Sequence, residues 1–215
     1  SFLDSDDMWM KDRLNKQLKK FNNKTGLVYS NLNVLDQSSK TTRIFTNKTL
    51  PSGKITSNLI RDYKMGVITV ILKKKLLKKL NLNFSNKYNV IGDFDLFVKL
   101  SKHTNIEVVQ EPMAIYRVHG NNFSLLNEGL TIKEFEYWLN MNKKNYKKSD
   151  LAELKSSVKW LTIKYNFHQN NWFKVFIKTI IFLVNINNIF YFFKRILSKS
   201  YETYYNFFQK KLVNK

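Results

Sequence analysis

Cysteine is absent from the 215 residues. Disulfides and thiolate metal sites are therefore excluded, and any metal ion must be held by oxygen atoms and imidazole nitrogens. Glycine and proline are scarce, with six and two residues, and neither occurs after Gly129. Because these residues interrupt helices, their absence from the last part of the chain predicts continuous helices there.

Acidic residues are also few, with 16 Asp and Glu against 37 Lys and Arg, which gives a formal net charge of +21. Such an excess attracts polyanions, namely nucleic acid, anionic lipid or phosphorylated small molecules. Lysine far outnumbers arginine, and asparagine is abundant. A coding sequence rich in A and T therefore explains the charge equally well. The length and a hydrophobic share of 43% suffice for one domain, with or without a helical appendage.

Hydrophobic periodicity predicts helices and strands mixed along the first part of the chain. Helices are expected over residues 8–23, 57–64, 73–80 and 93–103, strands over 27–35, 66–72 and, in two pieces, 106–119, and loops over 36–57 and 81–89. The tail is expected to be helical over residues 132–146, 150–166 and 171–198. The pattern predicts an α/β core, residues 1–128, with a C-terminal helical extension, residues 129–215.

Three carboxylates, Asp4, Asp6 and Asp7, crowd the start of the chain between two apolar pairs. Carboxylates this close repel one another unless a cation or a helix-capping role offsets the repulsion. Mg²⁺ and Mn²⁺ suit such a cluster. If residues 2–3 end a strand, the carboxylates lie at its carboxyl end, where α/β folds place their ligands. A solvated turn that caps the next helix fits the same spacing, so spacing alone leaves both interpretations open.

Two further segments carry candidate chemistry. Asp93 and Asp95 begin a predicted helix beside apolar residues, where a carboxylate serves either as a general base or as a helix cap. Residues 116–124 contain Arg117, which suits paired hydrogen bonds to a diphosphate. The same segment contains His119, which suits Mn²⁺ better than Mg²⁺. A structural hydrogen bond at the end of a strand is the alternative role for His119.

Taken in order, these segments resemble motifs of the family 2 glycosyltransferases. Residues 2–9, Phe-Leu-Asp-Ser-Asp-Asp-Met-Trp, resemble the D-x-D region of that family. Residues 92–96, Gly-Asp-Phe-Asp-Leu, resemble its general-base motif, although Gly92 stands where an acidic residue is frequent. Residues 116–124 fit the pattern Tyr-Arg-x-His-x-x-Asn-x-Ser that closes many of its domains. The resemblance covers a little over half of the chain.

The resemblance implies a partial GT-A fold, which is Rossmann-like, and a nucleotide-diphosphate sugar donor. It also implies a divalent cation, Mn²⁺ or Mg²⁺, that bridges the donor phosphates. Carried onto this chain, Asp6 is the expected metal ligand and Asp4 contacts the nucleotide or a metal-bound water. Arg117 is expected near the leaving diphosphate, and His119 is expected as a further metal ligand or phosphate contact.

The same resemblance assigns the general base of an inverting transfer to Asp93, with Asp95 as the second choice. The base takes the proton of the acceptor hydroxyl, so it must lie within hydrogen-bond reach of that group. A glycan or lipid-linked acceptor is implied, as in cell-surface polysaccharide biosynthesis. Neither the sugar nor the nucleotide follows from the sequence.

The segment over residues 172–197 is apolar and aromatic. It is interrupted by Lys174 and Lys178 near its start and by asparagines in its middle. Its uncharged part is shorter than the roughly 20 residues that a spanning helix needs. An interfacial amphipathic helix on an anionic membrane surface is expected, with a buried helix of a helical subdomain as the alternative. The expected location is cytoplasmic, peripheral on the inner face of the cell membrane.

Two other classes of function remain open from composition. A basic nucleic-acid-binding protein fits the net charge and the many aromatic residues. However, arginine is scarce, the basic residues are evenly spread, and the acidic cluster would repel phosphate, so no nucleic-acid partner is expected. A non-catalytic membrane-surface module is the other alternative. Metal-dependent binding of a nucleotide sugar separates the enzyme from both.

We predict that these 215 residues alone bind a sugar donor poorly. A chain rarely begins inside its most chemically loaded segment, so Ser1 is expected to fall within a larger domain. GT-A domains hold the base and ribose mainly with strands upstream of the D-x-D motif, and a sheet without them exposes an apolar edge. Titration calorimetry with nucleotide-diphosphate sugars is the measurement. Tight binding without added sequence would contradict the prediction.

Overall fold

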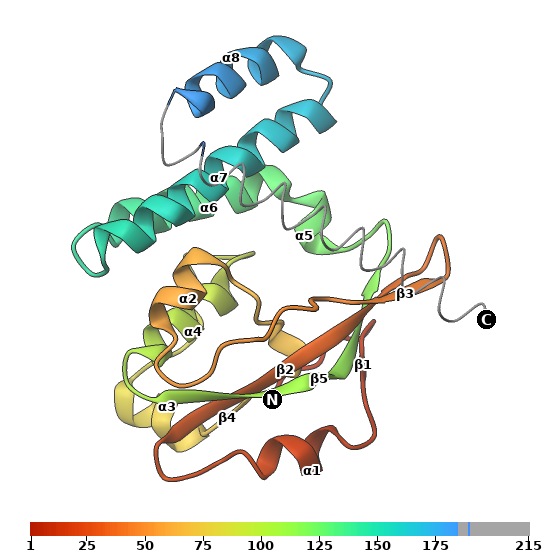
Figure 1. The fold of residues 1–215 in the computed structure, drawn as a ribbon, viewed down its shortest axis with the longest axis vertical. Helices are drawn as coiled ribbons and strands as arrows, with labels where there is room; N and C mark the ends of the chain where they lie inside the picture. Colours follow the sequence, from red (N-terminus) through yellow and green to blue (C-terminus); the bar gives the residue numbers. More distant parts are fainter. Residues whose placement is uncertain (185–188, 190–215) are drawn as a thin grey trace. The chain divides into compact units, whose positions relative to one another are not determined.

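The computed structural model describes residues 1–184 and 189, and these divide into two compact units, of which the first is Ser1–Trp138 and the second begins at Leu139 (Figure 1). The first unit is mixed α/β, which confirms the predicted fold class. In chain order it contains β1 (Met8–Trp9), α1 (Arg13–Leu18), β2 (Thr25–Asp36), β3 (Thr41–Ile44), α2 (Thr56–Arg61), the 3₁₀ helix η1 (Val67–Thr69), β4 (Ile71–Leu72), α3 (Lys74–Leu80), α4 (Gly92–Ser101), β5 (Asn105–Val118), α5 (Phe123–Leu126) and most of α6 (Glu128–Met141).

The sheet has the strand order β1-β5-β2-β3, and β4 pairs with β2. Strands β2 and β5 are parallel, whereas the other pairs are antiparallel. Consecutive residues Leu27, Val28 and Tyr29 of β2 are all buried, as expected for a strand that is covered on both faces. This strand, predicted over residues 27–35, is confirmed and extends from Thr25 to Asp36.

Strand β5 is continuous, although two strands on either side of Pro112 were expected. The pairing of β2 with β5 shifts register between Ser30 and Asn31, where the partner changes from Val109 to Pro112. A bulge of this kind accommodates proline, which has no N–H to donate to the neighbouring strand. The side chain of Gln110, in the bulge, instead bonds the backbone N–H and C=O of Leu50, each at 2.9 Å.

Helices cover both sides of the β2–β5 pair (Figure 1). Helix α4, predicted over residues 93–103, buries Phe94, Leu96, Phe97, Val98 and Leu100 and packs against α2. Helix α1 lies on the other side of the pair and contacts both strands. The core of the first unit therefore fixes the start of α4 relative to the ends of β2 and β5.

Three expectations for local structure were wrong, and in each case a tertiary contact explains the difference. Met8–Trp9, expected in a helix, form β1 because they pair with β5, and the Trp9 indole N–H donates to the carbonyl of Ile68. Thr41–Ile44, expected in a loop, pair with the end of β2 as β3. Val67–Thr69, expected in a strand, form η1, which places the Thr69 carbonyl where the Gln17 amide donates to it at 2.6 Å.

The second unit contains the end of α6 together with α7 (Lys148–His168) and α8 (Trp172–Leu183). Helices α7 and α8 pack together, and the rings of Trp160 and Phe182 lie 6.0 Å apart. The predicted tail helices are therefore present as far as Leu183, and the rest of the 171–198 prediction lies almost entirely outside the described residues. Among residues 1–184 and 189, no helix combines the length and apolar character needed to cross a membrane.

We predict that Gly26→Ala destabilises the first unit by about 1–3 kcal/mol, because an added methyl group overpacks the core. A Cβ at residue 26 would lie 2.6 Å from Thr104 Oγ1 and 2.4 Å from a methyl group of Leu76. Denaturant unfolding of the variant measures the loss. Gly120→Ala is the matched control, since a Cβ there meets nothing within 4 Å, and its change is expected within about 0.5 kcal/mol. Equal midpoints for both variants would contradict the prediction.

Candidate active site

The acidic segment forms a turn that leads into β1. The Asp7 N–H donates to the Asp4 carbonyl at 3.2 Å, which leaves Asp6 at the tip of the turn with 38% of its side chain exposed. Residues 2–3 do not end a strand, contrary to the conditional expectation, and Phe2 instead packs edge-on against Phe84. The carboxylates therefore precede a strand, and β1 places them beside the carboxyl end of β5.

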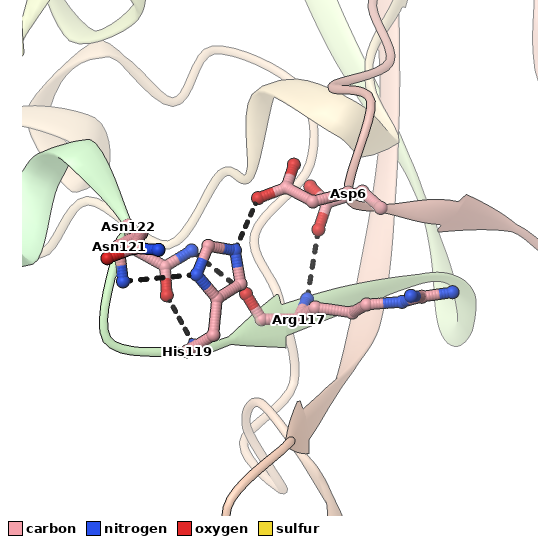
Figure 2. Close-up of polar contacts among 6 residues, drawn as sticks. Asp6, Arg117, His119, Asn121 and Asn122 are labelled. Carbon is pink, nitrogen blue, oxygen red and sulfur yellow. Dashed lines mark hydrogen bonds and ion pairs between the residues drawn. The ribbon is translucent and has the colours of Figure 1, made fainter.

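Asp6 and His119 meet across 113 residues of sequence. Asp6 Oδ2 lies 2.8 Å from His119 Nε2 (Figure 2). His119 Nδ1 accepts the Asn121 N–H at 3.2 Å, so in a neutral ring Nε2 carries the proton and donates to Asp6. This hydrogen bond is the main reason that the pKa of Asp6 lies below its usual value. The structure therefore brings the two predicted metal ligands into direct contact.

Asp7 is the buried member of the acidic cluster, with 7% of its surface exposed. Its Oδ1 accepts the backbone N–H of Arg117 at 2.9 Å, whereas Oδ2 has no hydrogen-bond partner among the described residues. Burial, together with the charges of Asp6 and Asp4, raises the pKa of Asp7 to about 6. Asp7 thus ties the acidic turn to the end of β5, a role that the sequence did not predict.

Asn122 shapes the loop that presents His119. Its Oδ1 accepts the His119 N–H at 2.6 Å, and its Nδ2 donates to the Arg117 carbonyl at 3.0 Å (Figure 2). Both contacts are local, and Asn122 itself is buried. The asparagine in the segment 116–124 is therefore explained by the turn that it closes.

The guanidinium of Arg117 points away from the ring of His119 (Figure 2). Its Nη2 donates to the sulfur of Met8 at 3.3 Å. Its charge still helps to lower the pKa of Asp6. In this conformation Arg117 bonds the acidic cluster through its backbone N–H, which donates to Asp7, and not through its guanidinium. The expected contact of Arg117 with a leaving diphosphate stays a prediction.

Asp93 is half-buried in the first turn of α4 and has defined partners for both oxygens. Oδ2 accepts the hydroxyl proton of Tyr63 at 2.9 Å, and Oδ1 accepts the Phe94 N–H at 2.8 Å. Burial is the largest cause of the raised pKa of Asp93, and the negative charge of Asp4 adds to it. The hydrogen bond from Tyr63 acts in the opposite direction. Asp93 and the acidic turn therefore share one electrostatic environment.

Asp95, the second choice for the base, has a structural role in this geometry. It is 1% exposed, and its Oδ1 accepts the indole N–H of Trp138 at 3.0 Å. Its Oδ2 lies 2.6 Å from the ammonium of Lys99, one turn further along α4. Because both Asp95 oxygens are engaged and the residue is almost fully buried, Asp93 is the better placed of the two candidates for the base.

Glu134 of α6 holds the segment that leads into α4. Its buried carboxylate accepts the N–H groups of Asn89, Val90 and Ile91 at 2.7, 3.0 and 3.1 Å. Amides at the start of a helix have no partner within the helix, and a negative charge is favourable there. Glu134 thereby fixes the turn from which Asp93 projects, although nothing in its local sequence distinguishes it from other helical glutamates.

The chemistry of Asp6 and His119 fits a divalent cation only as part of its coordination shell. Among residues 1–184 and 189, no three His, Asp or Glu side chains converge as they do in an all-protein metal site. One or two protein ligands suffice where substrate phosphates and water complete the shell, as Mg²⁺ commonly requires. Asp6 Oδ2 and His119 Nε2, which lie 2.8 Å apart, would supply two such ligands once the proton between them is released, because a ring nitrogen must be deprotonated to bind a metal.

Two characterised proteins are similar to the chain, although no protein-family model matches it. UDP-Glc:alpha-D-GlcNAc-diphosphoundecaprenol beta-1,3-glucosyltransferase WfgD of Escherichia coli is 29% identical over 111 residues, covering 51% of this chain and 40% of that protein. Amylovoran biosynthesis glycosyltransferase AmsB of Erwinia amylovora is 25% identical over 212 aligned residues, covering 92% of this chain and 67% of that protein.

The chain therefore spans two fifths of the first relative and about two thirds of the second. Both relatives are named glycosyltransferases, and the second is named for amylovoran biosynthesis. The mixed sheet with its flanking helices agrees with a Rossmann-like glycosyltransferase core.

We predict opposite shifts in the pKa of Asp93 from two substitutions. Tyr63→Phe removes a hydrogen bond to the ionised carboxylate and raises the pKa, whereas Asp4→Asn removes a like charge and lowers it. NMR titration of the Asp93 carboxyl carbon measures both shifts. Tyr137→Phe, at an exposed tyrosine of α6, is the control and is expected to leave the titration unchanged. Shifts of the same sign in the first two variants would contradict the proposed environment.

Proposed function

We propose that the chain contributes the metal-binding and general-base part of an inverting, metal-dependent glycosyltransferase of family 2, with residues 4–6 as its D-x-D motif. The reaction would transfer a sugar from a nucleotide-diphosphate sugar to a glycan or lipid-linked acceptor. The observation that carries the proposal is the Asp6–His119 contact of 2.8 Å, made between two segments that independently resemble motifs of this family. Similarity to two named glycosyltransferases supports it.

Asp6 and His119 would hold the cation, and Asp4 would face the nucleotide or a metal-bound water. An imidazole ligand favours Mn²⁺ over Mg²⁺. When bound, the cation would supply neutralisation of the charge that develops on the leaving diphosphate. Asp7, through its bond to the Arg117 N–H, would keep Asp6 in reach of His119.

Asp93 would accept the proton of the attacking acceptor hydroxyl. Its half-buried position leaves it accessible, and its raised pKa increases its affinity for that proton. Tyr63 and the Phe94 N–H would fix the orientation of the carboxylate.

The names of the relatives support the proposed classes of donor and acceptor. The E. coli protein is named for UDP-glucose and for a GlcNAc-diphosphoundecaprenol, which is a lipid-linked acceptor. The E. amylovora protein is named for amylovoran biosynthesis. If this protein also uses a lipid-linked acceptor, it would work at a membrane surface. We propose that it is a peripheral protein at the cytoplasmic surface of the cell membrane.

We predict that Asp6→Ala and Asp93→Asn each abolish transfer in the full-length enzyme, for different reasons. Loss of the base alone lowers kcat by about 10²–10⁴-fold and leaves Mn²⁺-dependent donor binding intact. Loss of Asp6 weakens that binding as well. The measurements are transfer assays and calorimetry, with Mn²⁺ and with UDP-glucose as the first donor.

Asp12→Ala is the matched control, since Asp12 is an exposed carboxylate six residues further along, with no side-chain hydrogen bond. It should retain wild-type transfer and binding. The proposal fails if Asp6→Ala keeps Mn²⁺-dependent donor binding, or if Asp12→Ala impairs transfer as much as Asp6→Ala does.

A further inference from the structure

Helix α8 turns its apolar side outward. Phe173, Phe176 and Trp172 are 75%, 67% and 59% exposed, and four further apolar side chains of the helix are exposed, namely Ile177, Ile180, Ile181 and Leu183. A helix on the surface of a water-soluble domain normally buries this side and exposes charge. Seven exposed large apolar side chains on one helix of 12 residues indicate an interaction site.

The opposite side of α8 holds it on the second unit. Phe182 is 1% exposed, and its ring packs against Trp160 of α7. The Asn171 side chain caps the start of α8 by accepting the Lys174 N–H at 3.3 Å. Because the helix has this separate anchor, its apolar side is not required for packing against α7.

Positive charge borders the apolar side. Lys174 and Lys178 are exposed and lie one turn apart on α8, and the helix has no acidic residue. Over residues 139–184 as a whole, nine lysines stand against two carboxylates. A second copy of the chain would bring the same excess of lysine to the interface, and like charges disfavour such a contact. Anionic lipid, in contrast, matches both the apolar side and its basic border.

We propose that α8 is an interfacial helix that docks the second unit on an anionic bilayer, with Trp172, Phe173 and Phe176 in the acyl boundary and Lys174 and Lys178 at the headgroups. The 12 residues of α8 span only about 18 Å, which suits a helix that lies in the membrane plane. Membrane docking is argued from the composition and exposure of α8 and not from the transfer chemistry. The docking proposal and the proposed transferase activity can therefore be tested independently.

Co-sedimentation of the full chain with vesicles tests the proposal. We expect binding to phosphatidylglycerol and phosphatidylcholine vesicles mixed at about 3:7, and much weaker binding to phosphatidylcholine alone. The double variant Phe173→Ser, Phe176→Ser should lower the partition coefficient at least about tenfold, because it removes two inserted aromatic rings. The double variant is expected to fold, because both substituted side chains are largely exposed. Circular dichroism checks this.

Two matched controls separate docking from general stickiness and from net charge. Leu14→Ser with Leu18→Ser removes two exposed apolar side chains of α1, 52% and 54% exposed, and should leave binding unchanged. Lys174→Gln with Lys178→Gln should reduce binding to anionic vesicles more than Lys143→Gln with Lys144→Gln, which removes the same charge from exposed lysines between α6 and α7.

Trp172 fluorescence, isolated by comparison with Trp172→Phe, reports the environment of the helix. A blue shift on vesicle addition, with quenching by brominated acyl chains, supports insertion. Equal partitioning of the double phenylalanine variant and the wild type would overturn the proposal. So would shielding of Trp172 from acrylamide before vesicles are added, or self-association that the phenylalanine substitutions abolish, because each assigns the apolar side to protein.

Discussion

The parallel pairing of β2 with β5 is the constraint on which the rest of the first unit depends. It joins segments that are about 80 residues apart and places the carboxyl end of β5 next to that of β2. Strand β1 then adds to the free side of β5, which brings the acidic turn to the same end. Asp6 and His119 depend on the β1–β5 pairing for their contact, because neither segment has local structure that extends to the other.

Electrostatic repulsion is the second constraint, and the three clustered carboxylates meet it in three ways. Asp6 gains a hydrogen bond from His119, Asp7 is buried against a backbone N–H, and Asp4 remains exposed to water. Only the buried carboxylate has a strongly raised pKa, about 6, because desolvation is the larger cost. Of Asp6 and Asp7, the arrangement keeps the more accessible Asp6 ionised. The ionised form is the one in which a carboxylate binds a cation.

How far the sequence predicted the structure depended on the range of the interaction. The β2 strand and the α4 helix follow from apolar periodicity, since both are core elements whose buried residues lie close together in sequence. Thr41–Ile44 and Val67–Thr69 were assigned wrongly because their conformations depend on β2 and on Gln17. The contact between Asp6 and His119 was anticipated only through the family resemblance, because the spacing of single residues specifies no tertiary contact.

The residues that the sequence did not reveal are those that support a candidate site residue from another element. Tyr63 reaches Asp93 from the segment after α2, and Glu134 reaches the amides before α4 from α6. A tyrosine after a short helix and a glutamate within a helix are ordinary in sequence, and their partners lie 30 and 45 residues away.

Helix α8 presents the reverse case. Its sequence alone fits either a buried or an interfacial helix. Its apolar side faces outward while Phe182 is buried, which favours the interfacial alternative. In α4, by contrast, the same kind of residue is enclosed by α2 and by the rings of Tyr63, Phe135 and Trp138. Apolar composition therefore predicts that one side of a helix will be shielded from water. Whether protein or another medium shields it depends on the tertiary structure.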